Sequence, residues 1–131
     1  MSREFEIKER GSIGEKYVCD YLTQRGYDIV TTNYHSRYGE IDIIASRNNV
    51  LAFVEVKTRT NTSMTGGFES ITKSKIRKII RTVGEYLMNN NSLCQPRIDC
   101  AQVIVDSTDN SLIDISYIEN AVEQEGLYAP F

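Results

Sequence analysis

Two apolar runs in the middle of the chain are separated by only four residues. Residues 40–45 and residues 50–56 are both rich in Ile, Val and Phe, which is typical of β-strands. The connection, residues 46–49, ends in Asn48 and Asn49, and asparagine tolerates the positive φ that a tight turn requires. The two runs therefore predict a β-hairpin with the two asparagines at its tip.

The turn determines which side chains of the two strands face one another. With the asparagines as the central turn residues, Asp42 lies opposite Glu55, and Glu40 lies opposite Lys57. Directly opposed side chains have Cβ atoms about 5 Å apart. The hairpin therefore brings two carboxylates together in a half-buried sheet, with an amine beside them.

Spacing alone leaves two interpretations of these four residues open. In the first, Asp42 and Glu55 hold Mg²⁺, which takes oxygen ligands and keeps several waters. Lys57 then orients or helps to deprotonate the attacking water, which is chemistry for hydrolysing a phosphodiester. In the second, Glu40 and Lys57 form an ordinary cross-strand ion pair, and Asp42 lies at a solvated strand end.

The rest of the chain supplies two helices and three more strands. Helical spacing of apolar residues predicts helices over residues 12–25 and 69–89. The predicted strands are residues 27–34, 96–106 and 112–118. An irregular or helical lead-in is expected at residues 1–10, and a short helix or tail at residues 119–131. The acids of the last two strands are interpreted as solvated strand ends. The order helix, three strands, helix, two strands favours a single α/β domain with a mixed sheet and helices on its faces.

Several motifs together resemble a known family. Asp42, twelve intervening residues and Glu55-Val56-Lys57 resemble the PD-(D/E)xK signature of the restriction-endonuclease-like nucleases, with Ile41 in place of the leading proline. More closely, the chain resembles the uncharacterised bacterial YraN-type family, often described as endonucleases similar to Holliday junction resolvases. The matching segments are Gly11-x-x-Gly14-Glu15, Tyr21-Leu22, Gly26-Tyr27, Asn33-Tyr34, residues 39–45, residues 53–59 and residues 119–121.

The resemblance implies a restriction-endonuclease-like three-layer sandwich whose central hairpin carries the site. It also implies an endonuclease that depends on Mg²⁺, or on Mn²⁺, and that acts on DNA, including branched or repair intermediates. An RNA substrate would use the same residues. The implied catalytic residues are Asp42, Glu55, Lys57, Glu15 and Glu40, and the implied metal ligands are Asp42, Glu55 and the backbone carbonyl of Val56. Action on a symmetric junction would need two active sites and hence a homodimer.

Two residues of the first predicted helix carry separate expectations. Gly14 falls within the apolar stripe, where glycine costs about 1 kcal/mol of helix propensity, so we expect the helix backbone to approach the sheet closely there. Glu15 follows Ser12 at the spacing of a capping box, in which its carboxylate would reach back to the Ser12 amide. The resemblance instead places Glu15 in the active site, and both roles stay open.

The basic residues are concentrated in the first three quarters of the chain. All 15 Lys and Arg residues lie at or before Arg97, although the net charge is −3. The predicted nucleic-acid contacts are Lys73, Lys75, Arg77, Lys78 and Arg81 on the second helix, with Arg37 and Arg59 near the hairpin. A solvated helix face is the alternative interpretation. No aromatic residue is interleaved with these helical cations, so the sequence does not indicate base stacking.

Two further segments have open interpretations. His35, the single histidine, is either an exposed loop residue, a phosphate contact or a proton carrier. The polar residues 61–67 follow the Glu-x-Lys strand and form either a loop that covers the site or a mobile crossover.

The absence of long apolar segments bears on location. No run approaches the roughly 20 apolar residues of a membrane span. The charged N-terminus lacks the apolar core of a signal peptide. We therefore expect a cytoplasmic protein.

A second function stays open besides a nuclease. It is a catalytically silent module that binds nucleic acid or a repair partner through its basic face.

Overall fold

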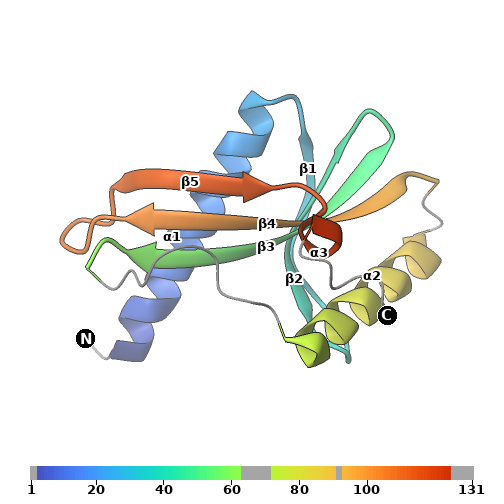
Figure 1. Cartoon of the computed structure of the whole chain (residues 1–131), viewed down its shortest axis with the longest axis horizontal. Coiled ribbons are helices and arrows are strands. Elements are labelled where there is room, and N and C mark those ends of the chain that lie inside the picture. Colours follow the sequence, from blue (N-terminus) through green and yellow to red (C-terminus); the bar gives the residue numbers. More distant parts are fainter. Residues whose placement is uncertain (1–2, 63–71, 91–92, 125–131) are drawn as a thin grey trace.

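The computed structural model describes residues 3–62, 72–90 and 93–124 of the chain. Its elements are α1 (Arg3–Gln24), β1 (Asp28–His35), β2 (Glu40–Arg47), β3 (Val50–Thr60), α2 (Lys73–Asn90), β4 (Gln95–Val105), β5 (Leu112–Ile118) and α3 (Ala121–Gln124). Figure 1 shows their arrangement. The predicted α/β class and the order of two helices and five strands are confirmed.

The five strands form one mixed sheet in the order β1-β2-β3-β4-β5. Neighbouring strands are antiparallel except β3 and β4, which are parallel and are joined through α2. The sheet is strongly twisted, because β1 and β2 run steeply across the direction of β3, β4 and β5 (Figure 1). The twist leaves the N-terminal end of β2 beside the middle of β3.

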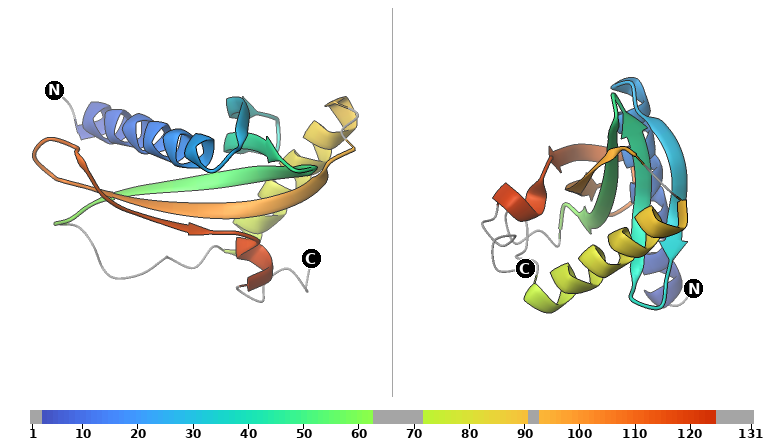
Figure 2. Two further views of the ribbon diagram at one scale, coloured as in Figure 1. Left: turned by 90° about the horizontal axis from the view of Figure 1, so that it is seen from above. Right: turned by 90° about the vertical axis from the view of Figure 1, so that its right-hand side faces the viewer.

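A helix packs on each face of the sheet, as the two further views in Figure 2 show. Val18 and Leu22 of α1 pack with Ile43 and Val54 in one buried cluster. Ile79 and Val83 of α2 belong to a second cluster with Ile41 and Phe53. The molecule therefore has three layers, with one apolar core between each helix and the sheet.

The predicted hairpin register is confirmed over the paired residues, whereas the predicted pairs of Asp42 with Glu55 and of Glu40 with Lys57 lie beyond the last backbone pair. Arg47 pairs with Val50, and the backbone pairing continues to Ile43 and Val54. Asn48 and Asn49 have φ values of 47° and 69°, which is the left-handed region expected for a two-residue hairpin turn.

Gly14 allows α1 to approach the sheet, as the sequence predicted. A Cβ atom at this position would lie 1.9 Å from Oγ1 of Thr58 on β3. Only a residue without a side chain fits there, so the cost in helix propensity is offset by close packing of the helix on the strand.

The start of each long helix differs from the prediction. The helix α1 begins at Arg3, so the lead-in is helical and Ser12 is a mid-helix residue. A mid-helix amide is bonded within the helix, and the predicted capping box of Ser12 and Glu15 is therefore wrong. The helix α2 begins at Lys73, where the hydroxyl of Thr72 accepts a hydrogen bond from the Lys75 amide at 3.1 Å. Residues 69–71 and most of the predicted 61–67 loop lie outside the described residues.

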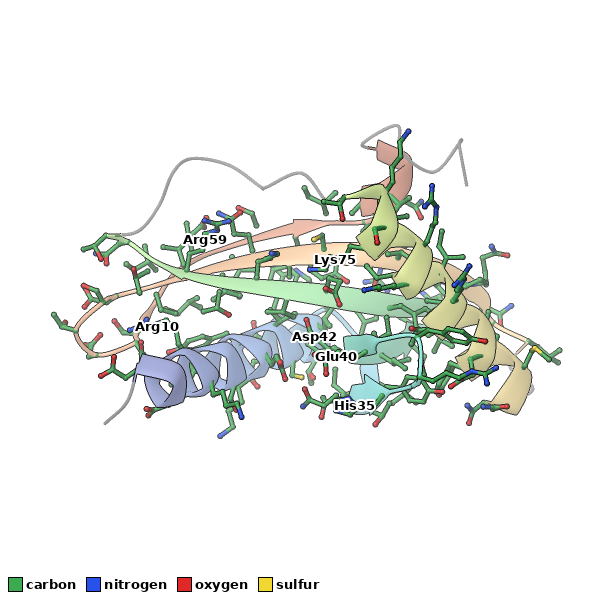
Figure 3. All side chains as sticks on the ribbon, turned by 90° about the horizontal axis from the view of Figure 1, so that it is seen from below. Arg10, His35, Glu40, Asp42, Arg59 and Lys75 are labelled. Carbon is green, nitrogen blue, oxygen red and sulfur yellow. The ribbon has the colours of Figure 1, made fainter. Side chains whose placement is uncertain are left out.

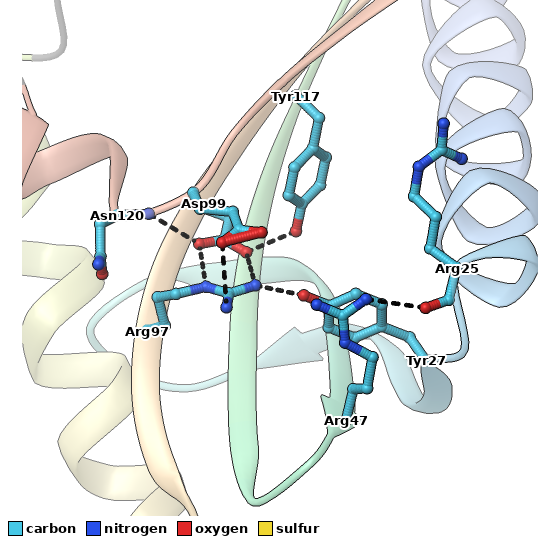
Figure 4. Close-up of polar contacts among 8 residues, drawn as sticks. Arg25, Tyr27, Arg47, Arg97, Asp99, Tyr117 and Asn120 are labelled. Atoms are coloured by element: carbon cyan, nitrogen blue, oxygen red, sulfur yellow. Dashed lines mark hydrogen bonds and ion pairs between the residues drawn. The ribbon is translucent and has the colours of Figure 1, made fainter.

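Asp99 on β4 is fully buried, which overturns its interpretation as a solvated acid. It accepts hydrogen bonds from Nε and Nη2 of Arg97, both at 2.8 Å, from the Tyr117 hydroxyl at 2.6 Å and from the Asn120 amide at 3.0 Å (Figure 4). Arg97 also donates to the Tyr27 hydroxyl. This network joins β4, β5 and the residues before β1 and α3, and its donors satisfy the buried charge.

None of the helices in the described part of the chain combines the length and the apolar character of a membrane span.

Candidate functional site

A cleft of about 390 Å³ lies where the N-terminal end of β2, the middle of β3 and the first turns of α2 meet. The strands contribute Glu40, Asp42 and Glu55, and the helix contributes Lys75 and Lys78. Figure 3 shows Glu40, Asp42 and Lys75 in this region of the molecule. Acids from the sheet thus face cations from the helix across one cleft, which we call the acidic cleft.

Asp42 and Glu55 line the same side of the sheet, as the hairpin register requires. Burial raises the pKa of Glu55 to about 7, and the nearby charge of Asp42 contributes to this shift. Burial also raises the pKa of Asp42, and Glu40 adds to that effect. The two carboxylates therefore repel one another in a largely buried environment, and this repulsion favours the binding of a positive charge.

The carboxylate of Asp42 is held in place by the neighbouring strand. Its Oδ2 atom accepts a hydrogen bond from the Val56 amide at 2.7 Å. This bond lies beyond Ile43 and Val54, the last backbone pair of the hairpin, so the side chain continues the strand contact where the backbones separate. A carboxylate has about four lone-pair sites, and the remaining ones are available to a cation in the cleft.

Lys57 follows Glu55 by two residues on β3 and so lies on the same side of that strand, although it does not line the acidic cleft. Its positive charge lowers the pKa of Asp42 and of Glu55, against the larger effect of burial. An amine in this place can hold a water molecule or a phosphate oxygen next to the carboxylates.

Lys75 belongs to the acidic cleft rather than to an outer surface. Its ammonium nitrogen lies 3.5 Å from Oε2 of Glu55, whose side chain is only 12% exposed. A sequence signal for this position exists, because Lys75 precedes the buried Ile79 by four residues and so lies on the same side of α2.

Glu40 and His35 lie at the exposed rim of the site. His35 is the last residue of β1, not a loop residue, and its Nδ1 atom is 3.2 Å from Oε2 of Glu40 on β2. Exposed pairs of this kind contribute little to stability. Glu40 therefore adds negative charge at the entrance to the cleft.

Glu15 lines a different cleft, of about 230 Å³, on the face that α1 covers. Arg59 and Val56 also line this second cleft. Burial raises the pKa of Glu15, and the charge of Asp42 raises it further. Glu15 is thus electrostatically coupled to the acidic cleft without lining it.

The implied metal ligands are two carboxylates and one backbone carbonyl. No group of three or more His, Cys, Asp or Glu side chains within the described ranges is arranged to hold a metal. Two carboxylates, a backbone carbonyl and water form an oxygen-only set, and Mg²⁺ is commonly bound by one or two carboxylates with several waters. Asp42, Glu55 and the Val56 carbonyl therefore fit Mg²⁺ better than a softer metal.

The predicted nucleic-acid contacts separate into groups. Lys75 and Lys78 line the acidic cleft. Arg37 and Arg81 line a third cleft, of about 780 Å³, together with Tyr38. Lys73 and Arg77 are exposed on α2 and do not belong to the lining of these clefts.

The model of the family described as "Uncharacterised protein family UPF0102" matches residues 14–103, a range that includes every residue of the acidic cleft. The chain belongs to this family. The UPF0102 protein of Dichelobacter nodosus is 43% identical over 89 residues, which cover 68% of this chain and 71% of that protein. The UPF0102 protein of Caldanaerobacter subterraneus is 36% identical over 115 residues, which cover 87% of this chain and 94% of that protein.

Membership of UPF0102 does not assign an activity, since the family is described as uncharacterised. The residues of the acidic cleft are therefore what indicates the chemistry of this UPF0102 protein.

Proposed function

We propose that this UPF0102 protein is an endonuclease that hydrolyses phosphodiester bonds of DNA and depends on Mg²⁺ or Mn²⁺. The observation that supports this most strongly is that Asp42 and Glu55 line one cleft, with Lys57 on the same side of β3 as Glu55. The proposal agrees with the resemblance of these residues to the PD-(D/E)xK signature and with the restriction-endonuclease-like order of elements.

Each residue has a separate role in the proposed reaction. Asp42, Glu55 and the Val56 carbonyl would hold the metal ion, which when bound supplies a Lewis acid for the phosphoryl oxygen and lowers the pKa of water. Lys57 orients the attacking water. Glu15 and Glu40 do not touch the reacting atoms in this scheme, and their negative charge favours a cation at Asp42.

The first turns of α2 would hold the phosphate groups. Thr72, Ser74, Lys75 and Lys78 line the acidic cleft at the N-terminal end of an 18-residue helix. Helix N-termini present unpaired amides and a partial positive charge, which favour anions. A phosphate here would lie between these cations and the acids that hold the metal.

A second candidate function follows from the ion pair between Lys75 and Glu55. If this ammonium permanently replaces the metal, the protein is a catalytically silent module that binds nucleic acid or a repair partner. Its binding would be sensitive to salt and indifferent to chelator.

Cleavage of labelled DNA separates the two candidates. Single-stranded, nicked and branched DNA are incubated with Mg²⁺, Mn²⁺ or EDTA, and products are resolved on denaturing gels. We expect metal-dependent cleavage by the wild type and a loss of at least about 100-fold in Asp42→Asn and Lys57→Ala. Lys16→Gln, at an exposed lysine of α1 that lines none of the three clefts, is the matched control and should cut at nearly the wild-type rate.

Two outcomes would remove the nuclease proposal. One is that no DNA or RNA substrate is cut under any metal condition. The other is that Asp42→Asn and Lys57→Ala cut as fast as the wild type. Symmetric cuts in a four-way junction would in addition require a homodimer, which sedimentation of the protein with junction DNA tests.

A further inference from the structure

The third cleft combines an aromatic ring with two arginines. It lies between the turn that joins β1 to β2 and the outer side of α2, and has a volume of about 780 Å³. The guanidinium carbons of Arg37 and Arg81 lie 5.0 Å and 5.9 Å from the centre of the Tyr38 ring. Arg37 also donates a hydrogen bond to the Tyr38 hydroxyl at 2.9 Å.

Tyr38 is placed there by contacts between its turn and α2. The Tyr38 amide donates to Oγ of Ser36 at 3.0 Å, and that hydroxyl lies 3.4 Å from Oγ1 of Thr82. Thr82 is fully buried in α2 and donates to the Lys78 carbonyl at 2.8 Å. The fold therefore brings an aromatic ring beside Arg81 of α2, a neighbour that the residue spacing within the helix could not indicate.

Gly84 leaves open space on the α2 side of this cleft. A Cβ atom at Gly84 would have no neighbour within 4 Å, so the helix backbone itself forms part of the wall. Glu85 and Asn89 follow along the same side, and Glu85 accepts a hydrogen bond from the Tyr34 hydroxyl at 3.1 Å. A carboxylate and an amide are the groups that bond to the polar edges of nucleobases.

Residues that line the third cleft are neighbours of residues that line the acidic cleft. Tyr38 is followed directly by Gly39, and Arg81 lies one helical turn after Lys78, and both Gly39 and Lys78 line the acidic cleft. A nucleic-acid strand with a phosphate at Lys78 can therefore place a neighbouring base beside Tyr38.

We propose that the third cleft binds an unpaired nucleobase, stacked on Tyr38 and on the guanidinium groups of Arg37 and Arg81. Bases in a duplex are already stacked and cannot enter such a pocket, whereas unpaired bases stack readily on aromatic rings and on arginine. The substrate class is therefore single-stranded or locally unpaired nucleic acid. This inference rests on the proposed function only for its choice of a nucleic-acid ligand.

The test measures binding without cleavage. Fluorescence anisotropy in EDTA compares a labelled oligothymidylate with an abasic oligonucleotide of equal length, which has the same phosphates and no bases. We expect the wild type to bind the base-bearing strand about tenfold more tightly, the size of a single good stacking contact. Tyr38→Ala and Gly84→Leu should each reduce this ratio to nearly one.

Matched variants separate loss of the pocket from loss of the fold. Leucine is a better helix former than glycine, so Gly84→Leu fills the cleft without weakening α2. Gly84→Ala adds only a methyl group in open space and should keep the ratio. Arg77→Gln should weaken binding of both strands equally, because its charge is outside the cleft.

The inference is overturned if the wild type binds both strands equally, or if Tyr38→Ala and Gly84→Leu both retain the wild-type ratio. The outcome is independent of catalysis. Asp42→Asn should lose cleavage and keep the ratio. A protein that shows the preference but cuts nothing would support this pocket and overturn only the nuclease proposal.

Discussion

The ammonium nitrogen of Lys75 lies 3.5 Å from Oε2 of Glu55 and so joins α2 to β3 across the acidic cleft. The charge of Lys75 also lowers the pKa of Asp42. In the metal-free protein this lysine is therefore a counter-charge for both acids. A cation that binds at the acids would meet the same positive charge and be repelled by it.

Lys75→Gln should consequently bind Mn²⁺ more tightly than the wild type does. Removing one positive charge next to the proposed ligands should increase the affinity by about 3- to 10-fold, on the order of 1 kcal/mol. The same variant should bind single-stranded DNA more weakly, because it loses a phosphate contact. Isothermal titration with Mn²⁺ measures the first effect, and Lys73→Gln, an exposed lysine outside the cleft, is its control. Equal or weaker Mn²⁺ binding by Lys75→Gln would contradict this account.

The raised pKa of Glu55 predicts how stability changes with pH in EDTA. The pKa of this group is about 7 in the folded protein, compared with an ordinary value of 4.5. Between these values the folded state binds more protons than the unfolded state, so the free energy of unfolding falls as pH rises. We expect Glu55 to contribute a decrease on the order of 2 kcal/mol between about pH 4.5 and pH 8. The raised pKa values of Asp42 and Glu15 act in the same direction.

Urea denaturation at several pH values checks this prediction. Glu55→Gln cannot ionise, so its free energy of unfolding should fall less steeply over this range than that of the wild type. A wild-type stability that rises between pH 5 and pH 8 would show that the buried acids are not destabilised by ionisation.

The acidic pair could be predicted from sequence because its determinants are local. Strand side chains alternate with period two, and the two asparagines fix the register. Once Arg47 and Val50 are paired, the register continues to Ile43 and Val54, and the next residues, Asp42 and Glu55, line one cleft. The close approach at Gly14 could also be predicted, because a glycine in an apolar helical stripe needs close packing to offset its loss of helix propensity.

The features that sequence missed depend on contacts between distant segments. Tyr38 lies beside Arg81 of α2 where its turn contacts Thr82, 44 positions further along the chain. Asp99 was interpreted as a solvated acid, because the sequence pattern does not reveal its hydrogen bonds with Arg97 and Tyr117. The charged start of α1 lacks an apolar period, so the first helix was predicted to begin at residue 12, after a lead-in that was either irregular or helical, and the cap at Ser12 was placed wrongly.

The network around Asp99 predicts a graded loss of stability. Asp99→Ala leaves the partly buried guanidinium of Arg97 without its main partner. We expect the free energy of unfolding to fall by about 3–5 kcal/mol. Tyr117→Phe removes one hydrogen bond while Arg97 and the Asn120 amide still bind the carboxylate, so its cost should be about 1–2 kcal/mol. Chemical denaturation measures both. Equal costs for the two variants would show that the hydroxyl and the guanidinium contribute alike.

The contact between Gly14 and Thr58 predicts opposite effects for the same substitution at two glycines of α1. Gly14→Ala places a methyl group 1.9 Å from Oγ1 of Thr58 and should destabilise the protein by about 2 kcal/mol or more. Gly11→Ala meets nothing within 4 Å and should stabilise it by up to about 1 kcal/mol through helix propensity.

Thr58→Ala tests whether this contact is the cause. It removes the hydroxyl at 1.9 Å and the methyl at 3.1 Å from the new Cβ, although the Thr58 Cβ itself stays at 3.0 Å. Gly14→Ala should therefore cost less in a Thr58→Ala background than in the wild type. In a double-mutant cycle measured by thermal denaturation we expect a coupling energy above about 0.5 kcal/mol, as for residues in direct contact. Strictly additive effects would mean that α1 moves away from β3 to accommodate the methyl group, and that Gly14 does not determine how closely this helix approaches the sheet.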